Sequence, residues 1–327
     1  MKLIICGNGF DMHHSLRTGY SDYQKNGFLN GSRVATDFVK FPWLKKSCKS
    51  NCWRNIEESL TIDIPELVKY IKEFYVEPDG SLASIELETD IDEWTDFIYS
   101  FTGDAFFKWL MQVDVKSAHR DPMLEPFFDD AVFVNFNYTS TLEDVYHIPP
   151  SQVLHLHGSL RNIDCSGLLS GDFLPSFNTI EDAECRADEV VRSDIHNSGI
   201  IRHEIQFGSP FVRRGDLETA LISAFGLDAV QNEKVFHKLL DFIDCAAKDI
   251  PHNIPSLNHF LEKKKITEVV VMGQSLGGPD DYYYKNVFLP NYRSLQWTFF
   301  CYSPDDKGEK ETFALRNGIK NARYCKW

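Results

Sequence analysis

The sequence predicts an α/β protein with a doubly wound, mostly parallel sheet of the Rossmann type, interrupted by helical insertions. Short apolar runs recur along the chain and end in glycine or in polar residues, which is typical of strands buried in a parallel sheet. Between them lie stretches with apolar residues at helical spacing. The chain of 327 residues is long enough for one such domain with insertions.

The first apolar run opens the chain as Leu-Ile-Ile-Cys, residues 3–6. It leads into five residues that we expect to contact a bound nucleotide: Gly7, Asn8, Gly9, Phe10 and Asp11. A Gly-x-Gly turn lets the backbone approach a ligand, and with a helix behind it the amides would form an anion site for a phosphate or pyrophosphate. Position 12 is Met where the full dinucleotide fingerprint has glycine, so a plain tight turn stays an alternative.

From about residue 21 to about residue 125 the pattern is helical, and we expect a helical insertion there between the first two strands. One helix is expected within residues 53–74, where Pro65 marks a break or a new first turn. Another is expected within residues 90–115, because acidic residues such as Asp90 suit a helix N-terminus. The aromatic residues recur at helical spacing, which favours a packed core over a base-stacking surface.

Two further strands end in polar residues that we expect to belong to the site. The strand that starts at residue 131 leads into Asn137 and Thr139, and a helix is expected to start near Thr139. Residues 152–156 form a short strand with His157 directly after it. Open parallel sheets bind ligands at the carboxyl ends of their strands, so one crevice can receive both Asn137 and His157. The alternative roles are structural, since asparagine also satisfies turn backbone groups and lone histidines are often structural.

The second half of the chain repeats the pattern of a buried strand and a glycine-rich turn. A polar, irregular stretch at about 160–204 is expected to be an insertion or lid. Residues 268–272 then form a strand whose following loop suits the phosphates or adenosine ribose of a dinucleotide. We expect four residues of this loop to contact the nucleotide: Gly273, Ser275, Leu276 and Asp280. The other expected elements are strands at 205–208, 295–302 and, at an edge, 322–326, and helices at 217–225, 232–248, 255–264 and 312–319.

Composition argues against several classes of protein. The net charge of −14 argues against nonspecific binding to nucleic acid or membranes. No apolar run reaches the length of a membrane span, and the opening run is too short for a secretory signal, so we expect a cytoplasmic protein with reduced thiols. Cys48 and Cys52 form the one close pair of cysteines, without a second pair or histidine motif, so no metal site is expected.

Four motifs together resemble the AbiH family of bacterial phage abortive-infection proteins. They are Ile-Cys-Gly-Asn-Gly-Phe-Asp at 5–11, Phe-Asn-Tyr-Thr-Ser-Thr-Leu-Glu at 136–143, Leu-His-Gly-Ser at 156–159, and Met-Gly-Gln-Ser-Leu with a later Asp at 272–280. Their order and spacing match the family over nearly the whole chain. The resemblance implies a single domain over residues 1–327 and an antiviral role in abortive infection.

That family is in turn similar to the sirtuin/DHS-like NAD-binding fold, which implies NAD as ligand or substrate. On that resemblance Asn137 contacts the nicotinamide ribose and His157 is the catalytic histidine, while the two glycine loops bind the rest of the nucleotide. Thr139 stands where sirtuins have aspartate. Only Cys165 and Cys185 stand where sirtuins carry a four-cysteine zinc module, so neither zinc nor deacylase activity is expected.

The expected activity is hydrolysis of NAD to nicotinamide and ADP-ribose. Cleavage of the nicotinamide–ribose bond passes through an oxocarbenium-like state, by analogy with glycosides, and needs a base or a positioned water. His157 is the expected base, and Asn137 would orient the water or the ribose. Asp11 would contact a ribose hydroxyl or the nicotinamide side, or cap the following helix.

Two alternatives to hydrolysis stay open. The first is a sensor that binds NAD, ADP-ribose or another nucleotide without turnover. The second is a defence enzyme that acts on nucleic acid, against which the acidic charge argues. The resemblance also implies a phage-derived or partner-protein trigger and a switch that depends on a homo-oligomer.

Overall fold

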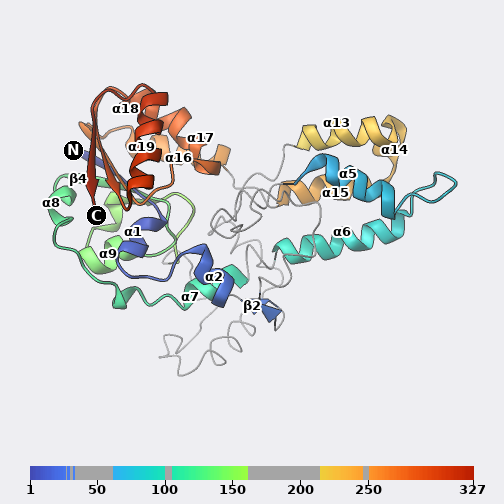
Figure 1. Ribbon diagram of the computed structural model, residues 1–327, viewed down its shortest axis with the longest axis horizontal. Helices are drawn as coiled ribbons and strands as arrows, with labels where there is room; N and C mark the ends of the chain where they lie inside the picture. The colour runs from blue at the N-terminus through green and yellow to red at the C-terminus, as the bar shows by residue number, and fades with distance from the viewer. Residues whose placement is uncertain (27, 30–31, 34–61, 100–104, 161–213, 246–249) are drawn as a thin grey trace. The chain divides into compact units, whose positions relative to one another are not determined.

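The structure, a computed structural model, describes residues 1–26, 28–29, 32–33, 62–99, 105–160, 214–245 and 250–327 (Figure 1). The chain divides into two compact units. The sheet unit consists of Met1–Gly19, Lys108–Gln206 and Asp249–Trp327, and the helical unit consists of Tyr20–Phe107 and Phe207–Lys248. Residues 161–204 of the expected lid, the expected strand at 205–208 and residues 34–61 of the expected insertion lie outside the described residues.

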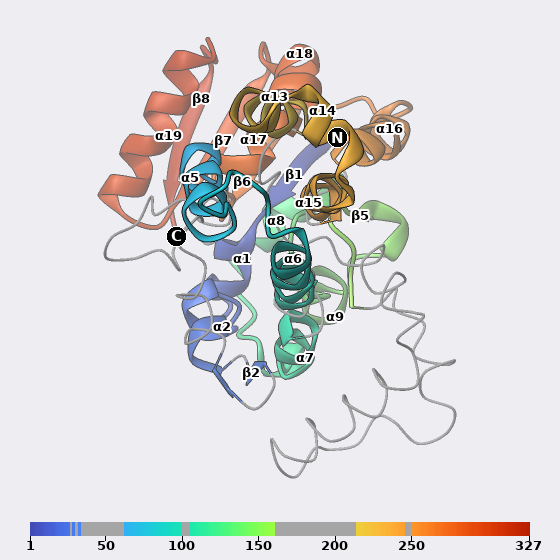
Figure 2. The same cartoon turned by 90° about the vertical axis from the view of Figure 1, so that its right-hand side faces the viewer.

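The sheet unit contains a six-stranded sheet in which every pairing is parallel, which confirms the predicted Rossmann-like α/β fold. Its strands are β1 (Lys2–Cys6), β4 (Ala131–Asn135), β5 (Val153–His155), β6 (Glu268–Met272), β7 (Gln296–Cys301) and β8 (Ala322–Lys326). Their spatial order is β5-β4-β1-β6-β7-β8. Five of these strands, β8, β7, β6, β1 and β5, are labelled in Figure 2. The order reverses between β1 and β6, and open sheets of this kind bind ligands beyond the strand ends at such a point.

Helices cover both faces of this sheet. Leu3 and Ile5 of β1 belong to one apolar cluster with residues of α16 (Ile250–Leu261) and α19 (Pro304–Arg316). Ile4 and Cys6 belong to the other cluster, with residues of α1 (Asn8–His13), α8 (Glu125–Phe128) and α9 (Thr141–Tyr146). Alternate residues of a strand point to opposite faces, so the continuous apolar run of β1 fills both cores.

Two helices of the sheet unit start earlier than the sequence pattern predicts. The helix expected at 255–264 begins at Ile250 and contains Pro255. The helix expected at 312–319 begins at Pro304, because the Ser303 hydroxyl caps it by accepting from the amide of Asp306 at 3.1 Å. The shorter elements of this part are η4 (Val115–Ser117), η5 (Pro150–Gln152), η6 (Gly278–Asp280), α17 (Asp281–Tyr283), the π-helix η7 (Tyr284–Phe288) and α18 (Leu289–Tyr292).

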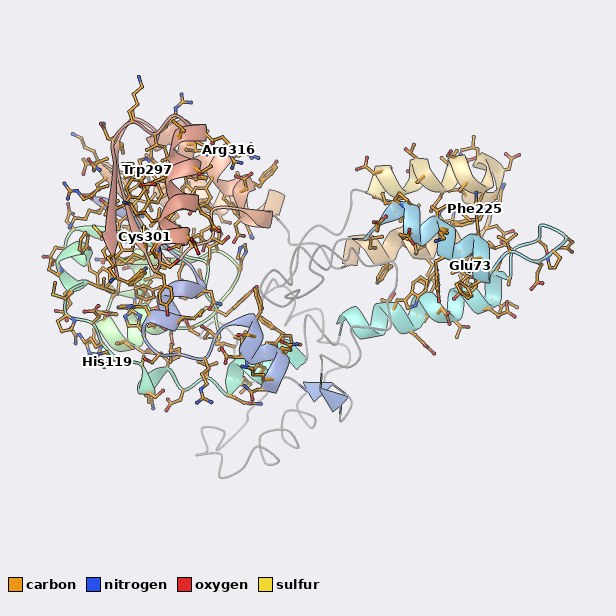
Figure 3. The ribbon with its side chains drawn as sticks, viewed as in Figure 1. Glu73, His119, Phe225, Trp297, Cys301 and Arg316 are labelled. Atoms are coloured by element: carbon orange, nitrogen blue, oxygen red, sulfur yellow. The ribbon has the colours of Figure 1, made fainter. Side chains whose placement is uncertain are left out.

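The helical unit is built from two separate stretches of the chain. Its helices are α2 (Tyr20–Asn26), α5 (Ile64–Phe74), α6 (Ser84–Tyr99), α13 (Arg214–Phe225), α14 (Leu227–Asn232) and α15 (Lys234–Cys245). It also contains a small hairpin of β2 (Phe28–Leu29) and β3 (Ser32–Arg33). The helix α7 (Ala105–Met111) begins in this unit and ends in the sheet unit. Phe225 at the end of α13 packs on Phe236 of α15, with ring centroids 5.2 Å apart (Figure 3). None of the helices in the described part of the chain combines the length and apolar character that a membrane span requires.

The helical unit confirms one predicted helix start and corrects two. Pro65 lies in the first turn of α5, whose N-cap Asp63 accepts from the Glu66 amide, as the new-first-turn interpretation predicts. The expected start at Asp90 is wrong, because α6 begins at Ser84 and its acidic residues pair sideways with Lys238 of α15. The single helix expected at 232–248 is the end of α14 followed by α15.

Candidate functional site

The loops that follow β1 and β6 are locked together at the point where the strand order reverses. The amide of Gly7 donates to the carbonyl of Met272 at 3.0 Å, and the amide of Gly9 donates to the carbonyl of Gly273 at 2.8 Å. A Cβ on Gly9 would lie 2.8 Å from the Gly273 Cα, so only glycine allows this approach. The amide of Phe10 also donates within the chain, to Gly7. Three amides that the sequence predicts to face a phosphate are thus engaged by backbone carbonyls.

The other residues of these two loops lie in different surroundings. Phe10 is fully buried, and its ring lies 4.4 Å from that of His14, so this side chain belongs to the core. Asn8 is half-buried at the first residue of α1. Ser275 is exposed, and Leu276 packs against the apolar cluster around α16 and α19. Among these four residues, Asn8 and Ser275 present polar side chains at the surface of the edge.

Just beyond β4, Asn137 makes three hydrogen bonds with Asn135, His155 and Gly7 among the described residues, and its side chain also acts on the carboxylate of Asp11. Its amide donates to Oδ1 of Asn135 at 3.0 Å, and its carbonyl accepts from Nδ1 of His155 at 3.1 Å. Its side-chain Nδ2 donates to the carbonyl of Gly7 at 3.0 Å. Because a carbonyl can only accept, this last bond fixes which way the side-chain amide is turned. The Oδ1 atom of Asn137 is an acceptor that none of these bonds uses.

Asp11 joins α1 to the loop after β4. Its carboxylate is 1% exposed and accepts from the hydroxyl of Thr139 at 2.5 Å and from that of Thr141 at 2.8 Å. Burial raises the pKa of Asp11 to about 6, although the two hydroxyls and the charge of nearby His155 act in the opposite direction. Asp11 and Thr139, both expected to contact the nucleotide, therefore bind each other.

The substitution Asp11→Asn is expected to change how stability depends on pH. The folded-state pKa of about 6 lies above the ordinary value of 3.8, so the folded state binds this proton more tightly than the unfolded chain does. That contribution, about 3 kcal/mol, is complete below about pH 4 and is lost as the pH rises through about 6. The wild type should therefore lose stability relative to Asp11→Asn between these values. Urea unfolding across this range measures the difference, and a constant difference would contradict the assignment.

Buried His157 and half-buried Asp280 form a pair at the same edge. Nε2 of His157 donates to Oδ1 of Asp280 at 3.0 Å, and Oδ2 of Asp280 accepts from Nε2 of Gln274 at 2.8 Å. The His157 side chain is 2% exposed, and its ring packs edge-on against that of Phe136. A carboxylate on Nε2 makes that nitrogen the donor and leaves the basic lone pair on Nδ1. Asp280, expected to contact the nucleotide, binds this histidine in the ligand-free chain.

The sheet register brings the two expected catalytic residues to one edge. Asn135 of β4 is paired with His155 of β5, and Asn137 and His157 each follow their strand's paired residue by two positions. Both side chains are buried and polar, at 5% and 2% exposure. The structure therefore brings Asn137 and His157 to adjacent strand ends, in line with the expectation that one crevice can receive both.

The sequence pattern missed three polar residues of this edge. Glu143 accepts from Nε2 of His155 at 2.9 Å, and Gln274 binds Asp280. Glu143 lies inside the motif at 136–143, and His155 precedes His157 by two residues, so the motifs themselves carried the signal. Within the described ranges no three His, Cys, Asp or Glu side chains gather as ligands of a metal would.

These features define a Rossmann-like α/β protein with a buried polar site at the carboxyl edge of β1, β4, β5 and β6. The chain matches the model of the family described as bacteriophage abortive infection AbiH over residues 3–301. It belongs to the AbiH family, which confirms that resemblance and assigns the chain a role in phage abortive infection. A comparison with curated proteins found no match, and a comparison with solved structures found none.

Proposed function

We propose that this AbiH protein binds NAD at the carboxyl edge of its sheet and hydrolyses it to nicotinamide and ADP-ribose, as a distant relative of the sirtuin-type fold. The observation that carries the proposal is the pair of buried His157 and half-buried Asp280, with Asn137 after the adjacent strand. A histidine whose second nitrogen is held by a carboxylate has the arrangement of a general base. Loss of NAD would stop an infected cell from supporting phage growth.

The hydrolysis breaks the bond between the nicotinamide nitrogen and C1′ of the ribose and forms a bond between C1′ and the oxygen of water. Nicotinamide leaves as a neutral ring, because it takes the electron pair of the broken bond. The proton of the attacking water passes to Nδ1 of His157, and Oδ1 of Asn137 orients that water or a ribose hydroxyl.

The charges and surface groups of the edge suit the two parts of the substrate. Positive charge develops on the ribose in the transition state, and the buried carboxylate of Asp11 and the half-buried carboxylate of Asp280 would stabilise it. The pyrophosphate would rest on the outer surface of the two locked loops, where Asn8 and Ser275 lie. This assignment moves the phosphate contact away from the amides of Gly7 and Gly9, which the chain itself uses.

The substitution His157→Ala tests the proposal. It should lower the rate of NAD consumption by about 10²–10⁴-fold, because it removes the base, while the affinity for NAD stays within a few fold. His259→Ala is the matched control, since this histidine is 84% exposed on α16 and should leave the rate unchanged. Product analysis should give equal amounts of nicotinamide and ADP-ribose. The assay is run on purified protein and on phage-infected cells, because the activity requires a trigger.

Three results would redirect the proposal. Binding of NAD or ADP-ribose in a thermal-shift titration, with no consumption of NAD in either setting, would favour the sensor. Consumption that His157→Ala does not reduce would place the catalytic site elsewhere. No shift with either nucleotide and no consumption would contradict a nucleotide site at this edge.

A further inference from the structure

A second imidazole–carboxylate pair lies at this edge, and the proposed hydrolysis does not use it. His155 is the last residue of β5, and Glu143 lies in the first turn of α9. Nε2 of His155 and Oε1 of Glu143 are 2.9 Å apart, and the two side chains are 7% and 5% exposed. The two side chains are therefore largely shielded from solvent, although β5 itself is half-buried.

The hydrogen bonds of His155 fix the number of protons that the pair holds. Nδ1 faces the carbonyl oxygen of Asn137 at 3.1 Å, and because that oxygen has no hydrogen to give, Nδ1 carries a proton. Nε2 faces Glu143, so one more proton lies between them, on the imidazole or on the carboxyl group. In both forms the pair has zero net charge, and the bond to Asn137 is kept.

The bond from His155 is one of the three that hold Asn137. The other two run to Oδ1 of Asn135 and to the carbonyl of Gly7. Among the described residues, His155 is the donor that reaches the carbonyl, and this bond helps to fix the peptide plane between Asn137 and Tyr138. Loss of the bond loosens this peptide and lets Oδ1 of Asn137 move away from a ligand, and a displacement of about 1 Å is enough to slow a reaction strongly.

The buried position of the Glu143 carboxyl group is not explained by a contribution to stability alone. Its Oε2 atom is buried and has no hydrogen-bond partner among the described residues. A buried carboxylate oxygen left unpaired costs stability, because it has lost its hydration without gaining a hydrogen bond. The pair also affects Asp11. Burial raises the pKa of Asp11, and the charge of His155 lowers it by a smaller amount.

We propose that His155 and Glu143 form a positioning pair, in which Glu143 orients the ring and the ring holds the Asn137 backbone so that Oδ1 of Asn137 meets the substrate. This inference rests on the proposed function for its substrate and deepens it by adding two residues to the site. The two residues act through Asn137 and touch no reacting atom.

Two substitutions at His155 separate its two hydrogen bonds. The amide nitrogen of asparagine stands near the position of Nδ1, so His155→Asn keeps the donor to Asn137 and loses the one to Glu143. The amide nitrogen of glutamine reaches the position of Nε2, so His155→Gln keeps the donor to Glu143 and loses the one to Asn137. Each variant loses one buried bond, and their melting temperatures report whether both remain folded.

We expect His155→Gln to lower kcat/KM for NAD by about 10–100-fold, and His155→Asn to stay within about fivefold of the wild type. A role confined to stability would affect the two variants alike. Equal values of kcat/KM, or a larger loss in His155→Asn, would overturn the positioning role.

A readout without any nucleotide keeps this test separate from the proposed function. Hydrogen exchange of the Asn137 side-chain amide, followed by NMR in the ligand-free protein, should be faster in His155→Gln than in His155→Asn. Slow exchange in both variants would refute the positioning pair even if NAD is hydrolysed. Faster exchange in His155→Gln, in a protein that neither binds nor consumes NAD, would support the pair and reject the substrate.

Discussion

Replacing Gly273 with alanine is expected to destabilise the sheet unit by at least about 3 kcal/mol. Gly273 has φ +66°, a conformation that costs an L-residue about 1–2 kcal/mol. A Cβ there would lie 2.1 Å from the amide nitrogen of Phe10 and 2.3 Å from the carbonyl carbon of Gly9. Both neighbours are backbone atoms, so no rotamer change relieves the clash, and the bond from Gly9 to Gly273 has to break.

Two other glycines of the same loop provide the controls for this experiment. Gly277 has open space around a Cβ, so Gly277→Ala should change the free energy of unfolding by less than about 0.5 kcal/mol. Gly278 also has open space but a φ of +69°, so Gly278→Ala isolates the conformational cost. Urea unfolding measures all three. A Gly273→Ala protein as stable as Gly278→Ala would mean that the loops are not locked as described.

Asp280→Asn should reduce the proposed hydrolysis of NAD by about 10²–10⁴-fold while leaving the fold intact. Gln274 donates to Oδ2 of Asp280, so an asparagine would keep its carbonyl toward Gln274 and turn its NH₂ group toward His157. Nε2 of His157 would then have to accept, which moves the ring proton to Nδ1 and removes the base. The substitution changes no volume, so the loss would report the tautomer of the histidine.

The neighbouring Asp281→Asn is the matched control for this loss. Asp281 pairs with Lys285 one helical turn away, and removing such a pair normally changes stability by less than about 1 kcal/mol. Single-turnover measurements of nicotinamide release compare the two variants, with the melting temperature as a check on folding. If Asp280→Asn kept full activity, His157 would not act as a base oriented by Asp280.

The strands were predictable because a strand buried on both faces reads as an unbroken apolar run. The strand β6 and the edge strand β8 begin and end where the sequence pattern places them. The start of α5 is predictable from Pro65, because proline suits the first turn of a helix, and the sequence Ser303-Pro304 carries a comparable signal for the start of α19. Asp90 misleads because acidic residues favour helix N-termini, but charge on a helix surface also forms pairs with a neighbouring helix.

The location of the site could be predicted, whereas the bonds within it could not. Strand order alone brings Asn137 and His157 to one edge. The bond between His157 and Asp280 spans 123 residues and depends on how the loop after β6 folds back, which no local pattern contains. The glycines are ambiguous for a physical reason: a residue without a side chain admits a phosphate or another backbone equally well, and here another backbone fills the space beside Gly9.

The central place of β1 in the sheet also determines when the site can first exist during synthesis. Its neighbours β4 and β6 lie far along the chain, and β6 follows β1 by about 260 residues. At about 5–20 residues per second, the ribosome needs roughly 13–50 s between making the two. Asp280 is made later still, 123 residues after His157, so a nascent chain holds this histidine without its carboxylate until the ribosome has translated that intervening stretch. On the proposed function, a partly synthesised copy that ends before Asp280 would lack the group that orients the base, and it would not hydrolyse NAD at the full rate.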